Sequence, residues 1–270
     1  MKTLMLTLNG REVEALAGET ILQVARREGV EIPTLCHQDG VEPASVCRLC
    51  LVELTDAKRV RLVTACSYPL TKSGLSVQTD TEGVLHNRRV IVELLLARCP
   101  ESDVLQNLAA RLGVTCDRFP AGDPAEKCIL CGLCERVCED AVKVRGISRA
   151  HRGIHRRMMA PFAEPPAGCT GCRACEFVCP TGAVVASVAG NLMSVDPWGA
   201  EVEMAECSCC GDRFAPRAAL RHAADKLGIE PEYLSVCLAC RQTRHGQELA
   251  KAVASSAARA VRESQRKVTV

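Results

Sequence analysis

Hydrophobic and polar positions alternate at the start of the chain and then follow a helical period. Residues 4–8 alternate, the Asn-Gly pair at 9–10 is a strong hairpin signal, and residues 13–15 continue as a second strand. The Glu-Thr pair at 19–20 opens a helix, because apolar side chains follow it at near-helical spacing. The pattern predicts a strand, a hairpin, a second strand and a helix ahead of a loop that contains the first cysteine.

Helical periodicity returns in later segments. The spacing predicts helices over residues 82–97, 103–112 and around 217–226. The alanine-rich segment 246–267 is a further helix candidate that packs either on the chain itself or on a partner. Proline and glycine residues at 120–124 favour a domain boundary there.

The composition predicts small domains that are held together partly by inorganic groups. The 270 residues include 19 cysteines but only four Phe, two Tyr and one Trp, which is little aromatic bulk for a large core. The 34 basic and 32 acidic residues give no global attraction to nucleic acid or to an anionic membrane. No segment resembles a secretory signal or a membrane span. We therefore expect a cytoplasmic protein, in which cysteines bind metals or react instead of forming disulfides.

The first group of cysteines follows the pattern C-x10-C-x2-C-x15-C and consists of Cys36, Cys47, Cys50 and Cys66. Thiolates are the soft, anionic ligands that an iron–sulfur cluster requires, and a four-cysteine zinc site is the alternative. The segments Pro-Thr-Leu-Cys-His at 33–37 and Val-Cys-Arg-Leu-Cys-Leu-Val-Glu at 46–53 closely resemble the N-terminal [2Fe–2S] domain of the large iron–sulfur subunit of respiratory complex I. The same domain occurs in diaphorase subunits of NAD-linked hydrogenases and in iron-only hydrogenases. The resemblance implies a β-grasp ferredoxin fold with a [2Fe–2S] cluster on these four residues.

Two further groups each follow C-x2-C-x2-C-x3-C, the run that is typical of [4Fe–4S] ferredoxins. The first run contains Cys128, Cys131, Cys134 and Cys138, and the second contains Cys169, Cys172, Cys175 and Cys179. In two-cluster domains the fourth cysteine of each run binds the other cluster. We therefore assign one [4Fe–4S] cluster to set A, which is Cys128, Cys131, Cys134 and Cys179. The other is assigned to set B, which is Cys138, Cys169, Cys172 and Cys175, and zinc binding by these eight residues is the alternative.

The last group contains two C-x2-C pairs, formed by Cys207, Cys210, Cys237 and Cys240. Paired knuckles suit a closed, tetrahedral Zn²⁺ site. A mononuclear iron site and a further iron–sulfur cluster are the alternatives. Cys99, Cys116 and Cys209 receive no role, although Cys99 is interpreted as a buried small apolar residue.

These observations predict an α+β protein with four parts. They are a β-grasp [2Fe–2S] ferredoxin domain over 1–80, a helical connector over 81–120, a two-cluster [4Fe–4S] ferredoxin domain over 121–195, and a small zinc-ribbon-like and helical module over 200–270. The last part contains the four-cysteine zinc site and the C-terminal helix.

Motifs for other chemistry are missing from the sequence. It contains no G-x-G-x-x-G dinucleotide fingerprint, no G-x-x-x-x-G-K-[ST] phosphate loop and no recognisable nucleophile triad. A chain with three clusters and no substrate motif is expected to be non-catalytic and to carry single electrons. The resemblance over residues 1–190 implies an electron-transfer subunit of a cytoplasmic, NAD(P)-linked oxidoreductase. Its implied partners are a flavin/NAD(P)H-binding subunit and a catalytic subunit such as a hydrogenase, a formate dehydrogenase or a heterodisulfide-reductase-like bifurcating flavoprotein.

Two other functions are alternatives to this one. The segment 143–157 contains Lys143, Arg145, Arg149, Arg152, Arg156 and Arg157 and no acidic residue. It permits an iron–sulfur redox sensor that binds nucleic acid, but no aromatic platform lies within it. We interpret it as a loop that offsets negative cluster charge or docks an acidic partner surface. An oxidoreductase in its own right would need a flavin site, and the sequence indicates none.

Overall fold

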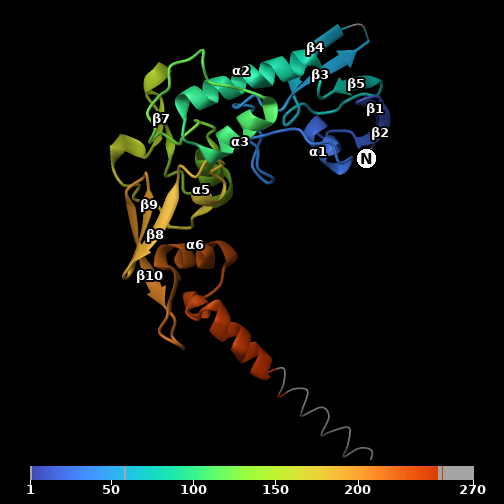
Figure 1. Cartoon of the computed structure of the whole chain (residues 1–270). Helices are drawn as coiled ribbons and strands as arrows, with labels where there is room; N and C mark the ends of the chain where they lie inside the picture. The colour runs from blue at the N-terminus through green and yellow to red at the C-terminus, as the bar shows by residue number, and fades with distance from the viewer. Residues whose placement is uncertain (1, 58, 249–250, 252–270) are drawn as a thin grey trace, which may run out of the picture. The chain divides into compact units, whose positions relative to one another are not determined.

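The computed structural model describes residues 2–57, 59–248 and 251 (Figure 1). The chain divides into two compact units. Unit 1 contains Met1–Gly168, Arg173–Ala186 and Val195–Gly199, and unit 2 contains Cys169–Cys172, Ser187–Ser194 and Ala200–Val270. The mixed content of helices and strands agrees with the predicted α+β class.

Unit 1 begins with a five-stranded sheet. Its strands are β1 (Thr3–Leu8), β2 (Arg11–Leu16), β3 (Leu51–Asp56), β4 (Arg59–Thr64) and β5 (Leu75–Gln78), in the order β2-β1-β5-β3-β4. β1 pairs with β2 antiparallel and with β5 parallel, while β3 is antiparallel to both β4 and β5. The alternation of the sequence explains the first hairpin, because Leu4, Leu6 and Leu8 are buried on one face while Thr3 and Met5 are exposed.

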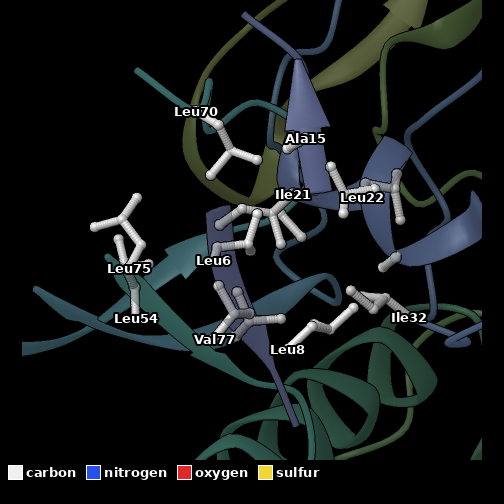
Figure 2. Close-up of a cluster of buried hydrophobic side chains, with 14 of the residues drawn as sticks. Leu6, Leu8, Ala15, Ile21, Leu22, Ile32, Leu54, Leu70, Leu75 and Val77 are labelled. Atoms are coloured by element: carbon white, nitrogen blue, oxygen red, sulfur yellow. The ribbon is translucent and has the colours of Figure 1, made fainter. Parts of the chain in front are cut away.

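Helix α1 (Ile21–Arg27) covers this core. Thr20 caps the helix and forms a capping box with Gln23, as the sequence predicted for its start. Figure 2 shows side chains of β1, α1 and β5, such as Leu6, Ile21 and Val77, gathered in one apolar cluster. Cys50 and Cys66 belong to the same cluster, so two of the predicted [2Fe–2S] ligands are part of the N-terminal core.

The two helices predicted after the sheet are present as α2 (Glu82–Arg98) and α3 (Asp103–Leu112), which lie side by side (Figure 1). Gly113 ends α3 at φ 64°, a left-handed conformation that glycine adopts without strain. A second apolar cluster joins these helices to the loop before β3 and to the first [4Fe–4S]-type run; it contains Val92, Leu105, Leu35, Leu49 and Ile129 among others.

The rest of unit 1 consists of short elements around the cysteine runs. They are α4 (Leu133–Arg136), the π-helix η1 (Val137–Val142), the paired strands β6 (Ser148–Ala150) and β7 (Arg157–Met159), the 3-10 turns η2 (Gly153–His155) and η3 (Pro161–Ala163), and α5 (Ala174–Phe177).

Most residues of a four-stranded sheet belong to unit 2. Its strands are β8 (Val185–Ala189), β9 (Leu192–Asp196), β10 (Ala200–Glu206) and β11 (Arg213–Pro216), in the order β11-β10-β9-β8. The predicted helix near 217–226 is α6 (Arg217–Leu227), which packs on β10 and β11, and η4 (Pro231–Leu234) follows it. Residues 238–248 are helical.

Most of the helix expected over 246–267 lies outside the described residues. The structure divides into two compact units. The finer division into four parts stays a prediction from the sequence. Among the described residues, no helix combines the length and the apolar character needed to cross a membrane.

Candidate iron–sulfur and metal sites

The predicted [2Fe–2S] ligands come together in unit 1. Cys36 and Cys47 lie on the loop between α1 and β3, Cys50 directly precedes β3, and Cys66 follows β4; all four are buried. The Cys47 N–H donates to the Cys36 sulfur at 3.3 Å. A hydrogen bond between these two thiols lowers the pKa of Cys36 to about 6 and raises that of Cys47. A second bond, between Cys50 and Cys66, lowers the pKa of Cys66 to about 6 and raises that of Cys50. Each of these two hydrogen bonds thus joins two of the four proposed ligands.

A buried arginine on α2 holds the loop that carries these ligands. Arg88 is 4% exposed, and its Nε and Nη2 donate to the carbonyls of Leu49 at 3.0 Å and Leu51 at 2.8 Å. Burial lowers the pKa of Arg88. The two carbonyls flank Cys50, so the guanidinium fixes the backbone at this ligand and places a positive charge near its sulfur.

Set A surrounds a cavity in unit 1. Cys128, Cys131, Cys134 and Cys179 all line this cavity of about 420 Å³. Backbone N–H groups already point at the sulfurs, since Leu130 donates to Cys128 at 3.4 Å and Ala183 donates to Cys179 at 3.2 Å. Such N–H to sulfur bonds are typical of sites in which sulfur carries negative charge.

The donor chemistry of set A fits a metal cluster. Burial raises the pKa of Cys131 to about 11 and raises the pKa of Cys134 and Cys128 as well, so without a cation these thiols keep their protons. A bound metal supplies the positive charge that makes thiolates stable in such a site. The same cavity is lined by Trp198, whose Nε1 is buried and has no hydrogen-bond partner among the described residues. Soft donors, room for several atoms and an unused N–H together fit a sulfide-containing cluster.

One side chain links the [2Fe–2S] ligand loop to set A. Arg136, the last residue of α4, donates from Nη2 to the Cys36 carbonyl at 3.0 Å and to the Cys131 carbonyl at 3.4 Å. Its Nη1 donates to the carbonyl of Glu42, which lies on the same loop as Cys36. The arginine also contributes to the lowered pKa of Cys36, although the bond from Cys47 is the larger cause. One guanidinium thus holds the two sets of ligands against each other within unit 1.

Set B is divided between the two units, so its ligands are described separately. Cys138 lies in η1 and Cys175 in α5, both in unit 1, and the Gly146 N–H donates to the Cys138 sulfur at 3.3 Å. Cys169 and Cys172 belong to unit 2. The assignment of set B stays a prediction.

The C-terminal cysteines gather in unit 2. The sulfurs of Cys207, Cys210, Cys237 and Cys240 all lie within 4.8 Å of one another. A tetrahedral ion with bonds of about 2.3 Å needs sulfurs about 3.8 Å apart, which this arrangement can supply. The Cys237 N–H donates to the Cys207 sulfur at 3.2 Å, and this bond is the main reason that the pKa of Cys207 falls to about 6. The geometry fits a single ion better than a cluster, whose cysteines bind different iron atoms and stand further apart.

The cysteines without an assigned role occupy different environments. Cys99 is fully buried in the second apolar cluster, where burial raises its pKa to about 12, in agreement with its interpretation as a small apolar residue. Cys116 is partly buried and its sulfur lies 3.6 Å from the Glu93 carbonyl. Cys209 is exposed between two members of the C-terminal group.

The basic segment is partly occupied by contacts within unit 1. Arg149 pairs with Glu135 at 3.2 Å and Arg145 with Glu139 at 3.3 Å, while Arg157 lines the cavity of set A. The two ion pairs neutralise glutamates that directly follow Cys134 and Cys138, and the interpretation of the segment stays a prediction. Sequence reasoning missed Arg88, Arg136 and Trp198, because no local pattern marks the site that each of them reaches.

Two family models match parts of the chain, and both describe iron–sulfur domains. Residues 1–82 match the family described as "2Fe-2S iron-sulfur cluster binding domain", and residues 127–183 match the "4Fe-4S dicluster domain". The two matches cover three of the predicted cysteine groups and stop short of the C-terminal one.

The relatives are subunits of nicotinamide-linked oxidoreductases. The chain is 31% identical over 217 residues to the NADP-reducing hydrogenase subunit HndD of Solidesulfovibrio fructosivorans, which covers 68% of this chain and 36% of the relative. It is 31% identical to the NADPH-Fe(3+) oxidoreductase subunit alpha of Geobacter sulfurreducens, over 67% of this chain and 24% of the relative. It is 28% identical to a subunit of the NADH-quinone oxidoreductase of Rhizobium meliloti, over 76% of this chain and 26% of the relative.

A solved structure shares the fold. A chain of an NAD+-reducing [NiFe]-hydrogenase in the H2-reduced state matches with a TM-score of 0.51 and 24% identity, covering 79% of this chain and 92% of that one. The family models and the relatives, together with this shared fold, confirm the resemblance stated from the sequence. The chain spans only about a quarter to a third of the length of the curated relatives.

Proposed function

We infer that this chain is an iron–sulfur electron-transfer subunit related to NAD(P)-linked oxidoreductase complexes, and the relatives described above support this inference. We propose that this chain is a non-catalytic subunit that passes single electrons between a flavin/NAD(P)H-binding subunit and a catalytic partner of a cytoplasmic complex. The catalytic partner would be a hydrogenase, a formate dehydrogenase or a heterodisulfide-reductase-like flavoprotein. The observation that carries the proposal is the link made by Arg136 between the loop of Cys36 and the loop of Cys131.

We propose the ligand sets as the sequence assigned them. Cys36, Cys47, Cys50 and Cys66 hold a [2Fe–2S] cluster, and sets A and B hold one [4Fe–4S] cluster each. Clusters of these kinds supply one-electron transfer at potentials that the protein adjusts through hydrogen bonds, burial and charge. The chain supplies those adjustments: N–H donors from Leu130 and Ala183 at set A, and the charges of Arg88 and Arg136 beside the first group.

We also propose that the C-terminal group holds one structural Zn²⁺. All four positions are filled by cysteines, which leaves no open place for a substrate or for water. Loss of this ion should affect folding of unit 2 and leave the proposed [2Fe–2S] and set A clusters, whose ligands all belong to unit 1, unchanged.

The experiment is metal and sulfide analysis of anaerobically purified full chain, combined with EPR of the reduced protein. The proposal expects about ten Fe and one Zn per chain, since a [2Fe–2S] and two [4Fe–4S] clusters contain that much iron. About fourteen Fe without zinc would contradict the zinc assignment and place a further cluster on the C-terminal group.

Single-ligand variants sharpen the assignment. Cys131→Ser should remove or alter one [4Fe–4S] signal, and Cys207→Ser should release zinc while the [2Fe–2S] signal and the signal of set A, whose ligands belong to unit 1, persist. The matched control is Cys116→Ser, a partly buried cysteine outside all proposed sets, which should retain all metals. Retention of every signal in Cys131→Ser would refute set A.

A further inference from the structure

The single tryptophan of the chain lies at the cavity of set A. Trp198 stands outside both segments that match family models. Its side chain is 5% exposed and lines the cavity together with the four cysteines, all within unit 1. Its own backbone N–H is used, because it donates to the Val195 carbonyl at 3.2 Å. This backbone hydrogen bond helps to hold the indole of Trp198 at the cavity wall.

The indole N–H has no use in the described protein. Nε1 of Trp198 is buried and has no hydrogen-bond partner among the described residues. A buried tryptophan N–H normally finds an acceptor, and a native structure that leaves one unpaired calls for an explanation. The cavity walls offer the thiol sulfurs of set A as soft acceptors, and a bound cluster adds inorganic sulfides inside the cavity.

We propose that Trp198 is a positioning residue whose Nε1–H donates to a sulfur of the [4Fe–4S] cluster on set A and raises the reduction potential of that cluster. The inference rests on the proposed ligand set. Reduction adds negative charge to the sulfurs, so an N–H donor stabilises the reduced form more than the oxidised form. The indole also contributes apolar surface to the cavity wall, which Met158 lines as well.

The first test is a potentiometric EPR titration of the full chain with Trp198→Phe, which keeps an aromatic wall and removes the donor. The midpoint potential of one [4Fe–4S] cluster should become more negative by about 59 mV. For a one-electron couple this shift corresponds to a tenfold change in the reduction equilibrium. The [2Fe–2S] midpoint should not shift. The matched control is Met158→Leu, because Met158 is 8% exposed, lines the same cavity and has no N–H donor in its side chain.

A second test needs no variant. Because the chain has one tryptophan, labelling with indole-¹⁵N tryptophan places a single magnetic nucleus of that kind at Trp198. Pulsed EPR of the reduced wild-type protein should then detect a ¹⁵N coupling on one [4Fe–4S] signal.

The outcomes separate the inference from the function it rests on. Full iron content with neither a shifted midpoint in Trp198→Phe nor a ¹⁵N coupling would overturn the role of Trp198 and leave the electron-transfer function standing. A wild-type protein without any [4Fe–4S] signal would overturn both. An equal shift in Met158→Leu would assign the effect to cavity packing and overturn the hydrogen bond.

Discussion

Arg88 is the only buried charged side chain in the described part of the chain. A buried charge is costly unless its donors are used, and Arg88 uses them on two carbonyls beside a cysteine ligand. Arg88→Met should therefore lower the free energy of unfolding by about 2–4 kcal/mol, because both carbonyls lose a charged donor. The measurement is denaturant unfolding followed by the visible circular dichroism of the [2Fe–2S] cluster.

Its neighbour on α2 provides the control. Arg89 is half-buried, pairs with exposed Glu82 at 3.0 Å and reaches the Leu112 carbonyl at 3.4 Å. Exposed pairs of this kind contribute about 0–1 kcal/mol, so Arg89→Met should change the unfolding free energy little. If Arg88→Met and Arg89→Met lowered the free energy of unfolding equally, the hydrogen bonds of Arg88 would contribute no stability of their own.

At the scale of elements, the short helix α4 is joined to the loop of residues 36–42 by the fork of Arg136. Arg136→Met removes a positive charge beside Cys36, so the [2Fe–2S] midpoint should shift to more negative potential. It also removes three donated bonds, so the protein should unfold more readily. Both effects are measured on the same sample, by redox titration with EPR and by thermal unfolding.

Arg136→Lys separates charge from geometry. Lysine keeps the positive charge but replaces the planar fork by a point charge, so the midpoint should return towards the wild-type value while the stability does not. If both variants leave the [2Fe–2S] midpoint where it was, the arginine has no electrostatic influence on that cluster.

The same elements show how much could be predicted from the sequence. The strands of the first hairpin, helices α1, α2, α3 and α6, and the cysteine groups follow from spacing within short segments, where each residue constrains its neighbours. Arg136 and Cys36 are 100 residues apart, and Arg88 and Leu49 are 39 apart. Packing across such separations has no local pattern, so neither arginine nor Trp198 could be assigned to its site in advance.

At the scale of the whole molecule, the candidate sites differ in how they relate to the two units. The [2Fe–2S] ligands and set A lie entirely in unit 1, and the C-terminal group lies entirely in unit 2. The apolar clusters of the first sheet and of α2 and α3 both lie inside unit 1. A change confined to the C-terminal metal should therefore not reach the first two sites.

Removal of the proposed C-terminal Zn²⁺ by a chelator tests this independence. The expected result is release of one Zn per chain and rapid proteolysis within 200–248, because a closed cysteine site contributes directly to folding. The [2Fe–2S] EPR signal should remain unchanged in line shape and intensity, since its ligands and their supporting arginines belong to unit 1. Cys207→Ser without chelator should show the same proteolysis, and Cys209→Ser, at an exposed neighbour outside the group, should resist it. A [2Fe–2S] signal that weakens in step with zinc release would show that the two units fold as one, and that the ion supports the whole molecule.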